Sequence, residues 1–130
     1  MGVIKMGKMG IESVEKKPDY RVIEITRTGT YKAVSNIAVA EDKLVIVALD
    51  KTDPNKVQIK EYDGTTGDII VGVIKENAVA GTNSVVIKRG KLNIEALDMT
   101  NISGLEGYEV IELLEQQNLF TEKLSERQNF

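Results

Sequence analysis

Short apolar runs alternate with polar turns along most of the chain, at intervals of roughly ten residues. Residues 44–49 (LVIVAL) and 68–74 (DIIVGVI) are rich in β-branched side chains and too short for a helix, which predicts buried strands. Residues 56–62 (KVQIKEY) alternate apolar and polar positions, which predicts a half-buried strand with Val57 and Ile59 on the same face.

Other extended segments are shorter and are bounded by turn residues. Strands are predicted in residues 20–26 (YRVIEIT), 84–89 (SVVIKR) and 91–94 (KLNI). Residues 27–30 (RTGT) are predicted to form a turn, and Gly90 is predicted to end the strand before it. Residues 50–55 (DKTDPN) are predicted to form another turn. Gly72 lies inside a strand pattern, which indicates a bulge or a close backbone approach.

Only residues 105–117 have a helical period. Their apolar residues fall at 105, 110, 111, 113 and 114, with glutamates at 106, 109, 112 and 115. This pattern predicts an amphipathic helix with Glu112 and Glu115 on its solvent face. Ser103 is the predicted N-cap, with Glu106 at the capping-box spacing, and Asn118 suits the left-handed position after the last turn. Two shorter features are predicted around this helix: a turn of helix at 95–97 and an apolar return to the core at 119–120.

The predicted fold is mainly β, a small barrel or sandwich with one C-terminal α-helix packed on it, α+β by strict count. A chain of 130 residues fits one domain. Residues 1–17 follow neither period and hold four lysines against two glutamates. We therefore predict an N-terminal arm at 1–17 and a single β-rich domain at 18–130. The arm is either a frayed terminus or a segment that orders on a partner.

Composition removes several classes of function. The chain has no cysteine and no histidine, so disulfides, thiolate metal sites and histidine-based catalysis are excluded. A net charge of −3 and the absence of tryptophan disfavour nucleic-acid binding. No apolar run approaches the ~20 residues that span a membrane, and lysines at 5 and 8 interrupt any signal peptide. We expect a non-secreted protein that is not an enzyme and needs no cofactor or metal.

Residues 62–68 (YDGTTGD) form an acidic, glycine-rich stretch with three possible roles. A calcium loop needs a closing bidentate carboxylate, and none follows. Catalysis by Glu61, Asp63 and Asp68 lacks a flanking aromatic or histidine to orient a substrate. A turn fits best, because glycine accepts positive φ at no steric cost.

A second charged group, Lys88, Arg89 and Lys91, lies within a predicted strand region. At strand spacing its members point to different faces, so we expect solvated charges.

The acidic stretch and the strands after it resemble the lambda-type bacteriophage head decoration protein family. The resemblance covers residues 44–120 and is carried by an ordered set of motifs: Tyr62-Asp63-Gly64, Val71-Gly72-Val73-Ile74, Val85-Val86, Arg89-Gly90, Asn93 and Ala96-Leu97. The short helix and the apolar tail follow in the same order. The chain differs from the family in having Asp98-Met99-Thr100 where a tryptophan-proline pair often stands.

The resemblance implies a structural protein that binds the major capsid protein of an expanded phage head and stabilises it. It implies a homotrimer on the outer surface of the capsid in the virion, assembled in the host cytoplasm. The arm would then be the capsid-binding element. Its candidate contact residues are Val3, Ile4, Lys5, Met6, Lys8, Met9 and Ile11.

Two other classes of function remain open. One is another small β-barrel phage assembly protein, such as a tail or fibre adaptor. The other is a cation-dependent carbohydrate-binding domain or a carboxylate enzyme that uses Glu61, Asp63 and Asp68. A trimer would need an apolar patch that one chain leaves exposed, and Val57, Ile59 and Leu119 are the candidates from the sequence.

Overall fold

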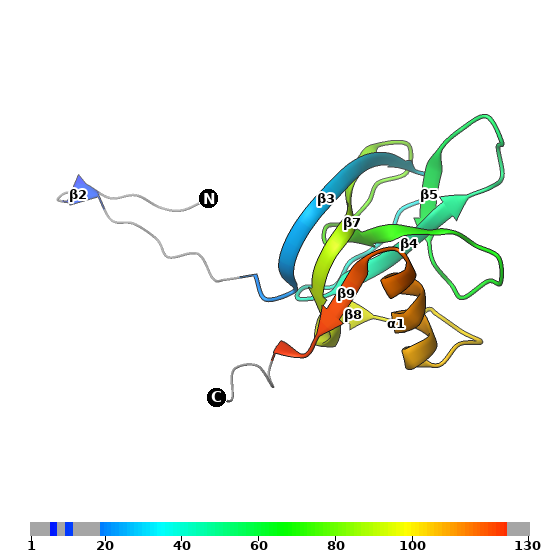
Figure 1. Ribbon diagram of the computed structural model, residues 1–130. Helices are drawn as coiled ribbons and strands as arrows, with labels where there is room; N and C mark the ends of the chain where they lie inside the picture. The colour runs from blue at the N-terminus through cyan, green and yellow to red at the C-terminus, as the bar shows by residue number, and fades with distance from the viewer. Residues whose placement is uncertain (1–5, 8–9, 12–18, 125–130) are drawn as a thin grey trace.

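The computed structural model describes residues 6–7, 10–11 and 19–124. In this part of the chain, seven strands form one sheet and a single α-helix packs against it (Figure 1). Those strands are β3 (Val22–Ala33), β4 (Leu44–Asp50), β5 (Gln58–Glu61), β6 (Ile70–Ile74), β7 (Asn83–Asn93), β8 (Leu97–Asp98) and β9 (Leu119–Glu122). The predicted fold class, mainly β with one helix packed on it, is confirmed.

The sheet closes into a barrel in the order β3-β5-β4-β6-β7. Its closing contact is the antiparallel pairing of β3 with β7, which runs from Val22 opposite Leu92 to Lys32 opposite Asn83. At the far end of β3, Lys32 and Ala33 pair in parallel with β5. β8 adds to β4 and β9 adds to β7, both in parallel.

The central strands β4 and β6 are buried on both faces. Alternate residues of β4 face two different apolar clusters: Leu44, Ile46 and Ala48 pack toward the helix, while Val45 and Val47 pack inside the barrel. All five residues of β6 are buried. The two apolar runs of the sequence therefore form the strands predicted for them, because side chains pack on both sides of each strand.

Gly72 in β6 allows a close backbone approach, as predicted. A Cβ atom at this position would lie 2.1 Å from the carbonyl oxygen of Ile87 in β7. Only glycine therefore lets β6 and β7 pack at this distance.

β3 and β7 are longer than the sequence predicted. The predicted turn at 27–30 is wrong, because these residues continue β3 and pair with β7. The prediction that Gly90 ends a strand is also wrong, since β7 runs through it to Asn93. Gly90 has φ +150°, and a Cβ there would lie 2.1 Å from the carbonyl oxygen of Glu24. The glycine thus permits a bulged pairing where the end of a strand was expected.

The helix α1 (Gly107–Gln116) packs Val110 and Leu114 into the cluster that Leu44 and Ile46 also enter. Figure 1 shows α1 beneath the strands and next to β9. Glu112 and Glu115 are exposed, as predicted.

The caps of this helix were predicted only in part. Glu106 is the N-cap, and its amide donates to the Glu109 carboxylate at 2.8 Å. The predicted cap, Ser103, instead donates its amide to the carbonyl oxygen of Asp63 at 3.1 Å. Asn118 has φ +64°, which confirms the left-handed position after the helix. The expected extra turn is the 3₁₀-helix η1 (Ile94–Ala96).

The trimer candidates read from the sequence do not form one exposed patch. Ile59 and Leu119 are fully buried in the barrel and helix clusters. Val57 is 70% exposed and precedes β5, so it does not share the inner face with Ile59. Among the residues described by the structure, no helix is long and apolar enough to cross a membrane.

Candidate functional site

The arm residues predicted to bind a capsid lie mostly outside the described residues: Val3, Ile4, Lys5, Lys8 and Met9. Met6 belongs to the two-residue strand β1 (Met6–Gly7), and Ile11 belongs to β2 (Gly10–Ile11). These strands pair antiparallel, with Met6 opposite Ile11. The backbone at residues 6–7 and 10–11 is therefore extended, and the capsid-binding role of the arm side chains stays a prediction.

The acidic stretch at 62–68 is a turn. Asp63 accepts hydrogen bonds from the Thr65 amide at 3.0 Å and the Thr65 hydroxyl at 2.6 Å, and these lower the pKa of Asp63 below its usual range. Gly64 and Gly67 both have positive φ. The amide of Ser103 closes the other side on the carbonyl of Asp63, so the turn positions the loop before α1.

The three carboxylates considered for catalysis each have a separate partner. Glu61 accepts from the Asn101 side-chain amide at 2.9 Å, and Asp68 forms a largely buried ion pair with Lys60 at 3.0 Å. Asp63 is occupied by Thr65. Within the described residues, no group of three metal-ligating side chains converges. The arrangement fits a structural role for these acids.

The Asp63 turn is one of three turns that share an Asp-x-Thr pattern, and the sequence reasoning did not recognise this repeat. Asp50 with Thr52 and Asp98 with Thr100 repeat the same pair of hydrogen bonds, in which the aspartate accepts from the threonine amide and hydroxyl. Each follows or ends a strand, where such a turn satisfies backbone donors. Asp98-Met99-Thr100 therefore has a structural function of its own at the position where the chain differs from the decoration family.

The base of the arm is fixed to the barrel by an ion-pair network around Asp19. Its carboxylate binds the Arg21 guanidinium at 2.9 Å and the Lys75 ammonium at 3.3 Å. Arg21 also donates to the carbonyl oxygens of Lys43 at 3.1 Å and Lys75 at 2.8 Å. The hydrogen bond from Arg21 holds the pKa of Asp19 well below its usual range. These contacts therefore hold Asp19, the first described residue after the predicted arm, against the barrel.

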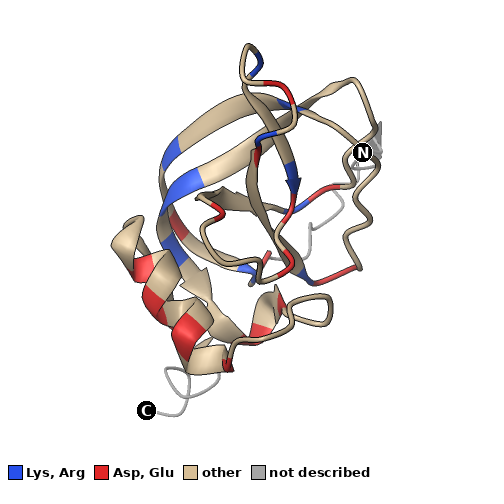
Figure 2. Cartoon of the chain, turned by 90° about the vertical axis from the view of Figure 1, so that its right-hand side faces the viewer, with Lys and Arg blue, Asp and Glu red and all other residues tan. Residues whose placement is uncertain are grey.

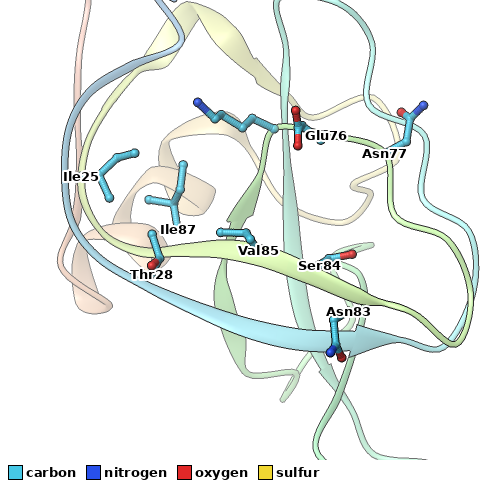
Figure 3. Close-up of a pocket in the computed structure, with 9 residues that line it drawn as sticks. Ile25, Thr28, Glu76, Asn77, Asn83, Ser84, Val85 and Ile87 are labelled. Carbon is cyan, nitrogen blue, oxygen red and sulfur yellow. The ribbon is translucent and has the colours of Figure 1, made fainter.

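A groove of about 390 Å³ lies beside this point, with Lys75 in its wall. Figure 3 shows Ile25 of β3 with Val85 and Ile87 of β7 projecting from the two-stranded ribbon toward Glu76. Ile25 is 46% exposed and Val85 is 63% exposed, although both are large apolar side chains. We call this surface the arm-base groove. The sequence reasoning missed it, because its apolar members come from strands about sixty residues apart.

A second surface, which we call the basic cleft, is lined by Arg27 of β3 and by Lys88 and Arg89 of β7. Arg27 and Arg89 are directly opposite each other across the strand pair. Figure 2 shows blue bands of basic residues on neighbouring strands above the helix. Lys88 and Arg89, expected on different faces of the strand, both line this cleft, where the pairing of β3 with β7 shifts register between Arg27 and Thr28.

Lys91, the third member of that charged group, forms an ion pair with Glu122 at 3.7 Å. Unlike Lys91, the three cations of the basic cleft form no ion pair with a carboxylate in the described part of the chain. Lys88 instead lies over the ring of Tyr31, 5.4 Å from its centre. Gln116, Gln117 and Asn118 complete the lining.

Comparisons with known proteins gave no match, whether with protein-family models, curated proteins or solved structures. Any assignment of function therefore depends on the chain's own residues and on the surfaces described above.

Proposed function

We propose that this protein is a structural capsid decoration protein, which binds the expanded head of a bacteriophage and stabilises it as a homotrimer. The observation that carries the proposal is the junction of the arm with the barrel. Asp19 is bound to Lys75, and Lys75 lines the groove that exposes Ile25 and Val85. The arm and an exposed apolar groove thus begin at the same corner of the molecule and can form one continuous binding surface.

The fold supports a structural role for the motifs shared with the decoration family. Tyr62-Asp63-Gly64 forms the turn that holds the loop before α1, and Gly72 allows β6 to approach β7. Asn93 caps η1 by accepting from the amide of Glu95 at 3.2 Å. These three motifs therefore maintain the barrel, whereas Val85 and Arg89 of the other motifs line surface grooves.

Binding by an extended arm has a simple physical basis. An extended segment can add to a strand edge of its partner, where backbone hydrogen bonds supply affinity with few demands on side chains. Three arms on one trimer bind multivalently, so individually weak contacts hold tightly.

The first test is co-sedimentation of the full chain, and of a version lacking residues 1–17, with expanded and unexpanded cognate phage shells. We expect the full chain to bind expanded shells only, and the shortened chain to lose binding. Equal binding without residues 1–17 would move the site from the arm to the barrel. Absence of binding to either shell would refute the proposal.

The groove needs a test of its own, since truncation probes only the arm. Val85→Asp places a charge in the exposed apolar groove and should weaken shell binding by about tenfold or more. Val57→Asp is the matched control, because Val57 is similarly exposed but is not among the residues that line the groove. Equal binding by the two variants would show that the groove does not contact the shell.

A further inference from the structure

The basic cleft contradicts a general rule of sheet stability. Like charges directly opposite each other on paired strands are destabilising, and Arg27 and Arg89 are such a pair. The carbonyl groups at the end of α1, near Gln116–Asn118, offset only part of this charge through the helix dipole. Violations of this kind are expected at functional sites. A partner that brings carboxylates to the cleft would remove the repulsion.

The outer face of α1 carries the complementary charge. The helix contains Glu109, Glu112 and Glu115 and has no lysine or arginine. Glu109 and Glu112 border a shallow depression of about 540 Å³, together with Leu105, Tyr108 and Leu113. Tyr108 is 74% exposed, and tyrosine is enriched among residues that dominate protein interfaces. We call this surface the helix face.

Apolar surface accompanies the charge on both sides. Phe120 is 47% exposed in a depression that adjoins the basic cleft and shares Arg89 and Asn118 with it. The helix face offers Tyr108 with two half-buried leucines. The two surfaces therefore carry opposite charges, and each has apolar side chains beside its charged ones, as in protein interfaces.

The acids of the helix face lie away from the cleft of their own copy. Gln116, the last residue of α1, lines the cleft, whereas Glu112 and Glu109 lie one to two helical turns, about 5–10 Å, farther back along the axis. Glu115 precedes Gln116 and is not among the lining residues. Figure 2 shows the acidic bands of α1 below the basic bands of β3 and β7. A second molecule can bring these carboxylates to the cleft.

We propose that the basic cleft of one copy binds the helix face of a second copy of this chain. The contact joins two different surfaces, and we take it as a head-to-tail arrangement, which closes into a ring when the rotation between copies closes. The inference relies on the proposed function only for the number of copies in the ring, which is three. Self-association through these surfaces does not require a phage head.

Charge reversal tests this contact in sedimentation velocity at low and high salt. We expect the wild type to associate at low salt and to dissociate as salt rises. Arg89→Glu and Glu112→Lys should each weaken association by about tenfold or more. The double variant Arg89→Glu/Glu112→Lys restores opposite charges in every contact and should recover association to within a few-fold.

Matched controls change the same charges elsewhere. Lys32→Glu alters an exposed residue of β3 that does not line the cleft, and Glu41→Lys alters an exposed turn. Both should associate like the wild type, and circular dichroism should show that all variants fold. A wild type that stays monomeric, or a double variant no better than the single ones, would overturn the inference.

The same variants separate this inference from the proposed function. If the wild type associates, Arg89→Glu does not, and the wild type binds no shells, the decoration function is refuted and the contact between copies is supported. A monomeric wild type whose binding to shells is lost in Arg89→Glu would assign the cleft to the capsid protein and overturn the second-copy contact.

Discussion

The strands β4 and β3 show two ways in which a sequence can form a strand. β4 is a short apolar run, and its first five residues are buried on both sides. β3 is nearly twice as long, and residues 24–28 are all exposed, so it is held mainly by its backbone pairing with β7. The core strand is therefore fixed by burial, while the exposed strand carries the side chains of both candidate binding surfaces. The residues that stabilise the core and the residues that line the candidate binding surfaces therefore lie on different strands.

The largest expected effect is on the free energy of unfolding, when an isoleucine is shortened in the buried strand β4 and in the exposed strand β3. Ile46→Ala removes a fully buried side chain of β4 and should lower the free energy of unfolding by about 3–4 kcal/mol. Ile25→Ala, in the exposed part of β3, should cost about 1 kcal/mol or less. Urea denaturation measures both. Equal losses would show that β3 is as much a part of the core as β4.

A smaller effect of opposite sign is expected at the basic cleft. Arg27→Thr removes one of two like charges that lie opposite each other, and should stabilise the isolated protein by about 0.2–1 kcal/mol at low salt. The gain should shrink at high salt, because salt screens exposed charges.

Lys32→Thr is the control for Arg27→Thr, since it makes the same kind of change on the same strand outside the cleft. Thermal unfolding of dilute samples, at two salt concentrations, gives the comparison. A destabilised Arg27→Thr variant would mean that the arginine pair is already compensated within one copy.

The smallest effect concerns the point where the arm joins β3. Hydrogen bonding to Arg21 depresses the pKa of Asp19 in the folded state, so its contribution to stability is present above the ordinary value of 3.8 and is lost as pH falls below it. Solvent screens this partly exposed pair, so we expect Asp19→Asn to cost less than about 1 kcal/mol at pH 7.

This difference between the wild type and Asp19→Asn should shrink steadily as the pH falls below about 4. Denaturation at several pH values measures it, with Glu41→Gln as a control for an exposed acid. A difference that persists unchanged at the lowest pH would mean that Asp19 contributes through packing and not through its charge.

The sequence by itself determined the elements whose stability is local or depends on apolar burial alone. The runs at 44–49 and 68–74 became β4 and β6, Asn118 took the left-handed position, and the glycines at 64 and 67 formed a turn. These features follow from side-chain periodicity and backbone conformational preference. Either of these can be read from a few neighbouring residues.

Tertiary structure alone decided how distant residues meet. The polar segment at 27–30 resembles a turn, but pairing with β7 supplies hydrogen bonds for its backbone and keeps it extended. Ser103 is not the N-cap, because α1 begins at Gly107. Its amide instead donates to the carbonyl oxygen of Asp63, in a distant turn of the chain. The groove, the basic cleft and the base of the arm join side chains from strands far apart in the chain. Their positions depend on sheet register, which no local pattern encodes.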